Sequence, residues 1–169
     1  MEGMVIRLAV LGCGNIGRFV MSNLGLDNLK AAALVGIDEA SLTMTKAPKA
    51  LAGAPYFDAH PIDLFAIHEP TVVFEGTAAE AIKGFPQNVN VAVALSLATL
   101  GSDKTRLRVV CDPKASRITV DIYARGATGE LRMHMVNLPS PDNPKTSYQA
   151  CCSALATLLR FSDHVQVGT

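Results

Sequence analysis

The residues with the clearest capacity for chemistry stand near the start of the chain, where three glycines follow a short apolar segment, Ile6–Leu11. In the run Gly12-Cys13-Gly14-Asn15-Ile16-Gly17, the first glycine permits a tight turn and the second lets the backbone approach phosphates. Gly17 lets the next helix pack closely, and the free N–H groups of that helix would face an anion. The pattern predicts that Gly12, Gly14, Asn15, Ile16 and Gly17 bind a dinucleotide pyrophosphate; the alternative is an ordinary strand-to-helix connection.

A second polar cluster, Asn143-Pro144-Lys145-Thr146-Ser147, precedes a segment with helical periodicity. The amino end of a helix attracts anions, so this cluster is a suitable place for a substrate carboxylate. Lys145 would supply a cation, and Thr146 and Ser147 would supply hydroxyl donors. Asn143, Lys145, Thr146 and Ser147 are therefore candidate substrate-binding residues, and the alternative is a plain helix start with proline at its first position.

The cysteines and histidines form no recognisable catalytic or metal-binding set. The cysteines lack the Cys-x-x-Cys spacing and histidine partners of a zinc site, so we expect no metal and interpret them as buried thiols. His134 lies in a predicted strand opposite the face of its apolar neighbours, and it could reach a cleft if the hairpin register allows. The remaining histidines fall in loops or near the end of the chain. These residues are Cys13, Cys111, Cys151 and Cys152, and His60, His68 and His164.

Composition excludes several classes of protein. Lys plus Arg and Asp plus Glu each number 15, so no basic excess would attract nucleic acid or anionic lipid. No apolar run approaches the roughly 20 residues of a membrane span, and the start lacks the pattern of a secretion signal. A hydrophobic fraction of 49% in 169 residues predicts one compact core. The sequence thus predicts a cytoplasmic protein that binds neither nucleic acid nor membrane.

The periodicity of the chain predicts an α/β start, a partial Rossmann unit, joined to an α+β domain with an antiparallel or mixed sheet covered by helices. Three consecutive strands with short connections predict an antiparallel meander. The predicted helices are Asp27–Leu34, Ala78–Lys83 with Thr77 as N-cap, Val89–Leu100 and Ser147–Phe161. The predicted strands are Ala40–Thr45, Thr71–Gly76, Arg106–Cys111, Arg117–Arg125 and Glu130–Asn137. The segment Lys46–Pro55 is predicted as a loop.

Asp38 admits two interpretations. It lies about 20 residues after the glycine turn, where dinucleotide-binding domains place an acid for the ribose, if Ala31–Ile37 is a parallel strand. Alternatively, Leu29–Leu34 is helical and Asp38-Glu39 is a turn into the next strand, since Leu, Lys and Ala favour helix.

Six further segments carry a recognisable pattern in their order and spacing: Gly25–Asp27, Leu42–Pro48, Val73–Gly76, Phe85–Ala92, Asp112-Pro113 and Asn143–Ser147. In these segments the chain resembles the L-aspartate dehydrogenase family. The resemblance implies an N-terminal Rossmann domain and an α+β domain that carries the catalytic residue and makes a homodimer. It also implies NAD- or NADP-dependent oxidation of L-aspartate to iminoaspartate, which feeds NAD biosynthesis or hydrolyses to oxaloacetate and ammonia. Asn90 matches the family's contact on the nicotinamide side; alternatively, Asn88 and Asn90 cap a helix from Val91.

The chain departs from the family pattern in two places. Most of the Rossmann domain would fall between Leu24 and Gly25, so residues 1–24 are expected to be a remnant and residues 25–169 the catalytic and dimerisation domain. This assignment places Asp38 in a turn. After Asp112-Pro113 the family has Asn, one residue and then the catalytic His, and here those positions are Ile118 and Val120. Valine cannot exchange a proton, so the resemblance predicts weak or absent activity and leaves a non-catalytic dimerisation scaffold as the alternative.

Overall fold

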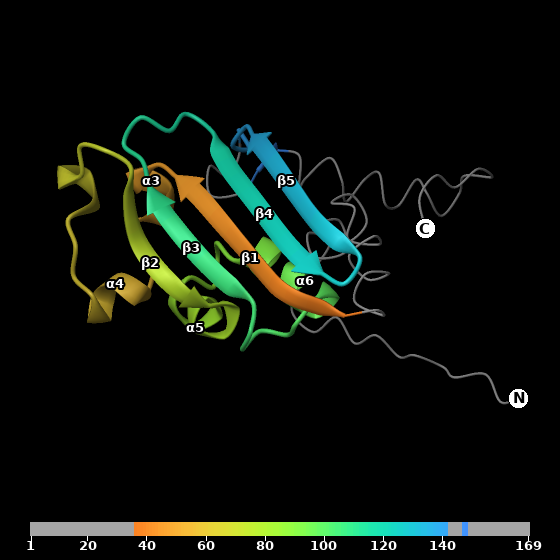
Figure 1. The fold of residues 1–169 in the computed structure, drawn as a ribbon. Coiled ribbons are helices and arrows are strands. Elements are labelled where there is room, and N and C mark those ends of the chain that lie inside the picture. The colour runs from red at the N-terminus through yellow and green to blue at the C-terminus, as the bar shows by residue number, and fades with distance from the viewer. Residues whose placement is uncertain (1–35, 142–146, 149–169) are drawn as a thin grey trace, which may run out of the picture.

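A computed structural model describes residues 36–141 and 147–148, which form a five-stranded sheet with helices on one face (Figure 1). The strands are β1 (Ile37–Lys46), β2 (Thr71–Thr77), β3 (Arg106–Cys111), β4 (Ile118–Gly126) and β5 (Gly129–Asn137). The helices are α3 (Pro48–Leu51), α4 (Tyr56–Ala59), α5 (Ala78–Gly84) and α6 (Asn90–Ala98), with a 3₁₀ turn at Leu64–Ala66. All five predicted strands in this range are confirmed.

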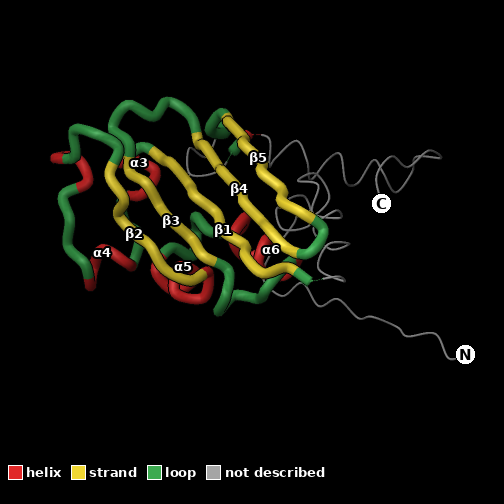
Figure 2. Tube along the Cα trace, viewed as in Figure 1, coloured by secondary structure: helices red, strands yellow, loops and turns green. Residues whose placement is uncertain are grey.

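The strand order is β2-β3-β1-β4-β5, with β1 parallel to β3 and antiparallel to β4 (Figure 2). The prediction of a mixed sheet is confirmed, but the predicted meander of β3, β4 and β5 is wrong. β1 lies between β3 and β4, so only β4 and β5 form a hairpin. Gly129 closes that hairpin with a positive φ of 119°, which glycine adopts without strain. The strand at the centre of the sheet thus comes from the start of the described chain.

Alternation along β1 and β4 explains why one face of the sheet is buried. Residues two apart point to the same face of a strand, and Leu42 and Met44 share a face with 1% and 2% exposure. Ile122 and Ala124 on β4 are buried on the same side. Helix α6 contacts β1, and α5 contacts β2 and β3, behind the sheet in Figure 1. The buried face and these helices form the hydrophobic core.

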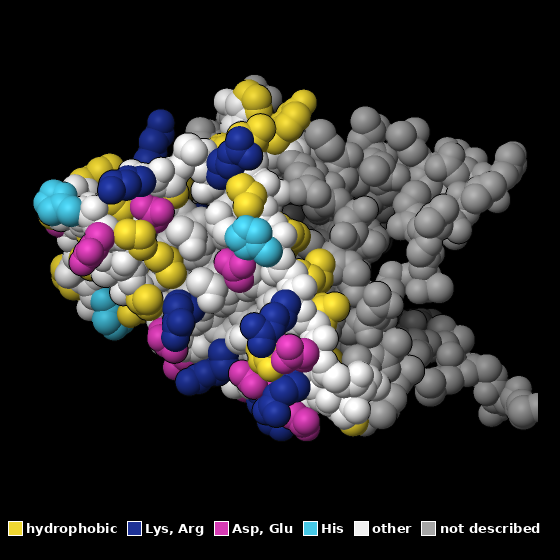
Figure 3. Space-filling model, turned by 45° about the horizontal axis from the view of Figure 1, so that its top comes forward, with side chains coloured by type: hydrophobic (Ala, Val, Ile, Leu, Met, Phe, Trp, Pro, Cys, Tyr) yellow, Lys and Arg dark blue, Asp and Glu magenta, His cyan; other side chains and the backbone are white. Residues whose placement is uncertain are grey.

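The opposite face of the sheet is open and carries charges of both signs (Figure 3). Glu75 on β2 and Arg108 on β3 form an exposed ion pair with a distance of 2.9 Å between Oε1 and Nη2. The guanidinium of Arg108 lowers the pKa of Glu75 by hydrogen bonding and by its charge. Exposed pairs of this kind contribute little to stability, so the fold is held by the helix-covered face.

Thr77 is the N-cap of α5, as the sequence predicts, and the structure shows that it forms a capping box with Glu80. Thr77 Oγ1 accepts a hydrogen bond from the backbone N–H of Glu80 at 3.2 Å, and Glu80 Oε2 accepts one from the N–H of Thr77 at 2.7 Å. These bonds satisfy two donors that a helix start otherwise leaves unpaired. The predicted loop Lys46–Pro55 is partly wrong, because it contains the short helix α3 with Pro48 at its first position.

Both interpretations of Asp38 are wrong, because β1 begins at Ile37 and Asp38 therefore lies inside a strand, neither after the end of one nor in a turn. Asp38 is exposed at the amino end of a strand, beside an irregularity in the pairing of Ile37 and Glu39. A ribose-binding acid would follow the carboxyl end of its strand, so that interpretation is not supported. The helix predicted at Asp27–Leu34, the glycine turn and the partial Rossmann unit lie outside the described residues. None of the helices in residues 36–141 has the length and apolar character that a bilayer crossing requires.

Candidate active site

Ile118 and Val120, the two positions at which the resemblance predicts the family's Asn and catalytic His, lie at the start of β4 on the helix-covered face. Their exposed fractions are 7% and 3%, and Val120 pairs with Met44 of β1. Side chains on this face contact the core rather than solvent. A polar pair at these positions would therefore project into the interior at one end of the sheet, whereas the residues present are apolar.

Lys46, the last residue of β1, continues the buried face of that strand. Thr45 lies opposite Thr119, so Lys46 is the next residue toward Ile118. Only 4% of Lys46 is exposed, and its Nζ donates a hydrogen bond to Oδ1 of Asn88 over 2.6 Å. Burial lowers the pKa of this amine to about 8, because removal from water disfavours the charged form. A titratable cation thus lies beside the start of β4.

Asn88 is positioned by an aromatic cluster at the end of α5. Phe85 is fully buried, and its ring lies 5.0 Å from that of Tyr56 and 5.3 Å from that of Phe74. The turn after Phe85 closes when the N–H of Asn88 donates to the carbonyl of Phe85 at 2.9 Å. Anchoring Phe85 in the core therefore places the Asn88 carboxamide against the end of β1.

Helix α6 begins at Asn90, and its N-cap is Val89 without a side-chain hydrogen bond. The prediction that Asn88 and Asn90 cap a helix from Val91 is therefore wrong, since Asn88 uses its carboxamide to accept from Lys46. Asn90 is half-buried in the first turn of α6. Within the described part of the chain, its carboxamide makes no hydrogen bond, which leaves it able both to donate and to accept.

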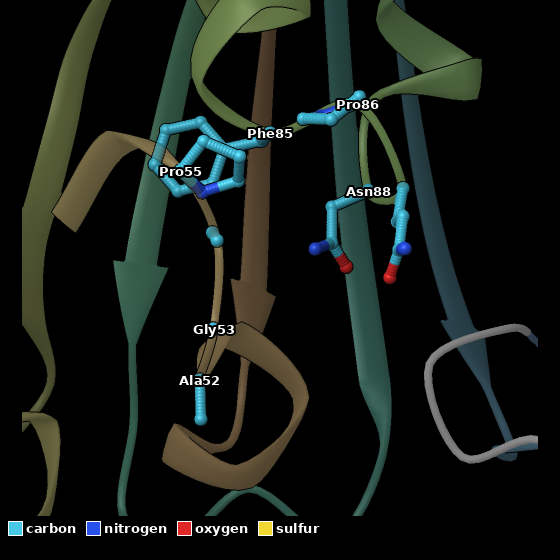
Figure 4. Close-up of a pocket in the computed structure, with 8 residues that line it drawn as sticks. Ala52, Gly53, Pro55, Phe85, Pro86 and Asn88 are labelled. Atoms are coloured by element: carbon cyan, nitrogen blue, oxygen red, sulfur yellow. The ribbon is translucent and has the colours of Figure 1, made fainter. Parts of the chain in front are cut away.

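A pocket of about 110 Å³ separates the turn Phe85–Asn88 from the segment Ala52–Pro55. Figure 4 shows its labelled residues on two facing segments, with Pro55 beside Phe85 and Asn88 across from Ala52 and Gly53. At roughly 30 Å³ for each water molecule, this volume holds a few waters or a small polar group. Asn88 lines this pocket and also accepts the hydrogen bond from Lys46.

The family model described as aspartate dehydrogenase, C-terminal, matches residues 27–161, and this match covers the whole of the site just described. The chain belongs to the aspartate dehydrogenase family. The L-aspartate dehydrogenase of Methanosarcina mazei is 46% identical over 145 residues, which cover 86% of this chain and 54% of that protein. The L-aspartate dehydrogenase of Bradyrhizobium diazoefficiens is 38% identical over 165 residues, which cover 96% of this chain and 59% of the relative.

The chain spans about half the length of the curated relatives it matches. The crystal structure of aspartate dehydrogenase from Thermotoga maritima superimposes with a TM-score of 0.61 at 24% identity, and the alignment covers 85% of this chain and 52% of that one. The structural match shows a shared fold. The resemblance seen in the sequence is thus confirmed at the level of the family.

The other predicted residues of this aspartate dehydrogenase domain are only partly placed. Ser147 is half-buried and pairs with Pro139 through an isolated bridge. Three groups of predicted residues lie outside the described part of the chain. They are Gly12, Gly14, Asn15, Ile16 and Gly17 of the glycine turn; Asn143, Lys145 and Thr146 of the second cluster; and Cys13, Cys151, Cys152 and His164.

Two other predictions have clear outcomes. His134 pairs with Asp121 in the β4–β5 register and hydrogen-bonds it on the exposed face, away from Val120, so the suggestion that it reaches the same cleft is wrong. Cys111 is fully buried, which confirms the prediction of a buried thiol. Burial and the neighbouring Asp112 raise the pKa of that thiol, which makes it a poor nucleophile.

Lys46 is the residue of this aspartate dehydrogenase domain that sequence reasoning missed, because it was assigned to a loop. The alternation of the strand could have found it. Ala40, Leu42 and Met44 occupy every second position on the buried face, and Lys46 is the next residue in that series. A lysine in register with a buried face is unusual, since lysine is rarely buried without a partner. Extending the strand by one residue would have placed the cation in the core.

Proposed function

We propose that this chain oxidises L-aspartate to iminoaspartate with NAD or NADP, and does so slowly. The observation that carries the proposal is the match of the aspartate dehydrogenase model to residues 27–161. Residues 25–169 would form the substrate and dimerisation domain of a cytoplasmic homodimer, and residues 1–24 a remnant of the cofactor domain. The iminoaspartate would feed NAD biosynthesis or hydrolyse to oxaloacetate and ammonia.

Oxidation of an amine to an imine removes a hydride from carbon and a proton from nitrogen. A positioned acid or base typically accelerates such proton transfer by about 10²- to 10⁴-fold. The family's catalytic His would occupy the position of Val120, which has no group that exchanges a proton. Ile118 likewise replaces an Asn that can donate and accept hydrogen bonds. The low rate follows from these two substitutions.

The residues near the site are compatible with a nicotinamide cofactor. Asn90 has a half-buried carboxamide without a described partner, and this group can pair with the carboxamide of a nicotinamide. Gly12, Gly14, Asn15, Ile16 and Gly17 would hold the pyrophosphate. The chemistry that such a cofactor supplies when bound is acceptance of the substrate hydride. Asn90 would orient the ring, and the buried strand face would exclude water.

The segment Asn143–Ser147 would contribute to binding of the substrate. Ser147 is held by its bridge to Pro139, which follows β5 in the chain. Asn143, Lys145 and Thr146 precede it and would supply donors and a cation for a carboxylate.

An aspartate-dependent reduction assay tests the proposal. Purified full-length chain is incubated with L-aspartate and either NAD or NADP, and formation of the reduced cofactor is followed by absorbance. D-Aspartate and L-malate serve as controls for stereochemistry and for the amine. We expect a slow signal that requires L-aspartate. No turnover together with no calorimetric binding of either cofactor at millimolar concentration would overturn the proposal in favour of a non-catalytic scaffold.

A further inference from the structure

The ammonium of Lys46 occupies an environment that calls for an anion. Lys46 is buried, with 4% of the residue exposed. An ammonium carries three N–H donors, and the described structure assigns one acceptor, Oδ1 of Asn88. A buried charge is costly unless it is both hydrogen-bonded and paired. With one neutral acceptor, two N–H groups of the ammonium lack acceptors in the described structure and its positive charge lacks a negative partner.

The described residues around Lys46 do not provide the missing negative charge. The neighbouring titratable groups are Cys111 on β3, Asp112 directly after it, and Lys49 on α3. Asp112 accepts a hydrogen bond from the N–H of Lys114 at 2.8 Å, and none of these groups pairs with Lys46 among residues 36–141 and 147–148. Ile118, next to Lys46 on β4, is uncharged.

Asn88 provides further hydrogen-bond donors beside Lys46, and these make the position suitable for binding an anionic ligand. Because its Oδ1 accepts from Lys46, its two amide N–H groups are left as donors. Asn88 also lines the pocket between Phe85–Asn88 and Ala52–Pro55 (Figure 4). An ammonium and an amide donor side by side match the two oxygens of a carboxylate, and charge-assisted hydrogen bonds of this kind are strong.

We propose that Lys46 and Asn88 bind one carboxylate of a small dicarboxylic acid at the edge of this pocket. The identity of that acid as L-aspartate or oxaloacetate rests on the proposed function, whereas binding of a carboxylate does not. Lys46 follows Thr45, which pairs with Thr119, so it lies on the side of Ile118 and diagonally from Val120. A carboxylate bound to Lys46 and Asn88 would therefore lie at the end of the sheet where β1 ends and β4 begins.

Calorimetric titration of the full chain with succinate, an unreactive four-carbon dicarboxylate, tests this proposal. We expect Lys46→Met to weaken succinate binding by about 10- to 100-fold, the usual worth of a hydrogen bond to a charged group. Lys49→Met is the matched control, because it removes the same charge from an exposed position on α3 three residues away. Lys49→Met should bind succinate as tightly as the wild-type chain.

The pH dependence of succinate binding separates Lys46 from other cations. Wild-type affinity should fall above about pH 8, where the Lys46 amine loses its proton. Lys46→Arg should retain its affinity over the same range, because arginine stays protonated. In the wild-type chain, nuclear magnetic resonance of the labelled Lys46 amine should show its pKa rising when succinate saturates the site. This measurement needs no variant and so does not depend on any variant folding.

Three outcomes would overturn the proposal: no succinate binding by the wild-type chain, equal binding by Lys46→Met, or equal weakening by Lys49→Met. An unchanged pKa of Lys46 at saturating succinate would also overturn it. If succinate binding depends on Lys46 while the aspartate assay shows no turnover, the carboxylate site stands and the proposed dehydrogenase function fails. If aspartate is oxidised but Lys46→Met retains wild-type succinate affinity, the function stands and the site fails.

Discussion

Lys46 and Asn88 are joined by a 2.6 Å hydrogen bond although 42 residues separate them in the chain. The bond connects the end of the central strand β1 to the turn before α6. It places a buried cation on the side of Ile118 and joins it to Asn88, which precedes the start of α6 at Asn90. The polar side chains of Lys46 and Asn88 thus lie at the end of the sheet that carries Ile118.

Restoring the family residues should raise the rate of aspartate oxidation. We expect the double variant Ile118→Asn, Val120→His to increase aspartate-dependent turnover by about 10²- to 10⁴-fold, because it returns a group that can exchange a proton. Reduced cofactor is measured by absorbance. The control pairs Ile118→Asn with Val120→Gln, which is polar but does not exchange a proton at neutral pH. A folded double variant with no gain over this control would contradict the proton-transfer explanation.

Placing a carboxylate at position 88 should raise the pKa of Lys46. In Asn88→Asp the new side chain lies within hydrogen-bond distance of Nζ and supplies the missing negative charge, so the protonated amine is favoured. We expect the pKa of Lys46 to rise above about 8 and succinate binding to weaken, because the internal carboxylate competes for the ammonium. Resonance titration of the labelled amine provides the measurement. Asn88→Ala, which supplies no charge, should not raise the pKa; an equal rise would show that charge pairing is not the cause.

Stability should respond to pH through Lys46 in a direction set by its lowered pKa. Between about pH 8 and the ordinary value of 10.5, the unfolded chain keeps a proton on this amine that the folded chain has lost. Because the unfolded state binds more protons in this range, the free energy of unfolding increases as the pH rises, by at most about 1 kcal/mol per pH unit. Below about pH 8 the Lys46 amine is protonated in the folded chain, and the full cost of burying this charge lowers the free energy of unfolding.

Comparison of the wild-type chain with Lys46→Met isolates this contribution. Denaturant unfolding of both proteins is measured at several pH values between about 7 and 10.5. The wild-type chain should gain stability relative to the variant as pH rises through this window. Cys111, whose raised pKa contributes with the opposite sign, is present in both proteins and cancels in the difference. A difference that stays constant with pH would mean that Lys46 titrates normally in the folded state.

Removing the capping box should destabilise α5 and the turn that it positions. Thr77→Ala loses the acceptor for the N–H of Glu80 and should cost about 1 kcal/mol of unfolding free energy. Thr77→Ser keeps the hydroxyl and should remain close to the wild-type value. Denaturant midpoints of the three proteins give the comparison. Equal losses in both variants would assign the effect to the methyl group of Thr77 rather than to the hydrogen bond.

Local patterns predicted the elements that carry the site. Leu42 and Met44 alternate with polar residues, as expected for a strand with one buried face, and Thr77 followed by Glu80 is the signature of a capped helix. These features depend on neighbours within a few residues. The segments that resemble the aspartate dehydrogenase family likewise predicted the family, and the match of the family model to residues 27–161 confirms it.

The sequence by itself determined the strands, the N-cap of α5 and the family. Only the tertiary structure decided that β1 lies between β3 and β4, that His134 points away from the core, and that Lys46 contacts Asn88. The physical reason is that strand order and register come from pairing between distant segments, which no local periodicity specifies. The burial of Lys46 results from that pairing, and its lowered pKa results from the burial.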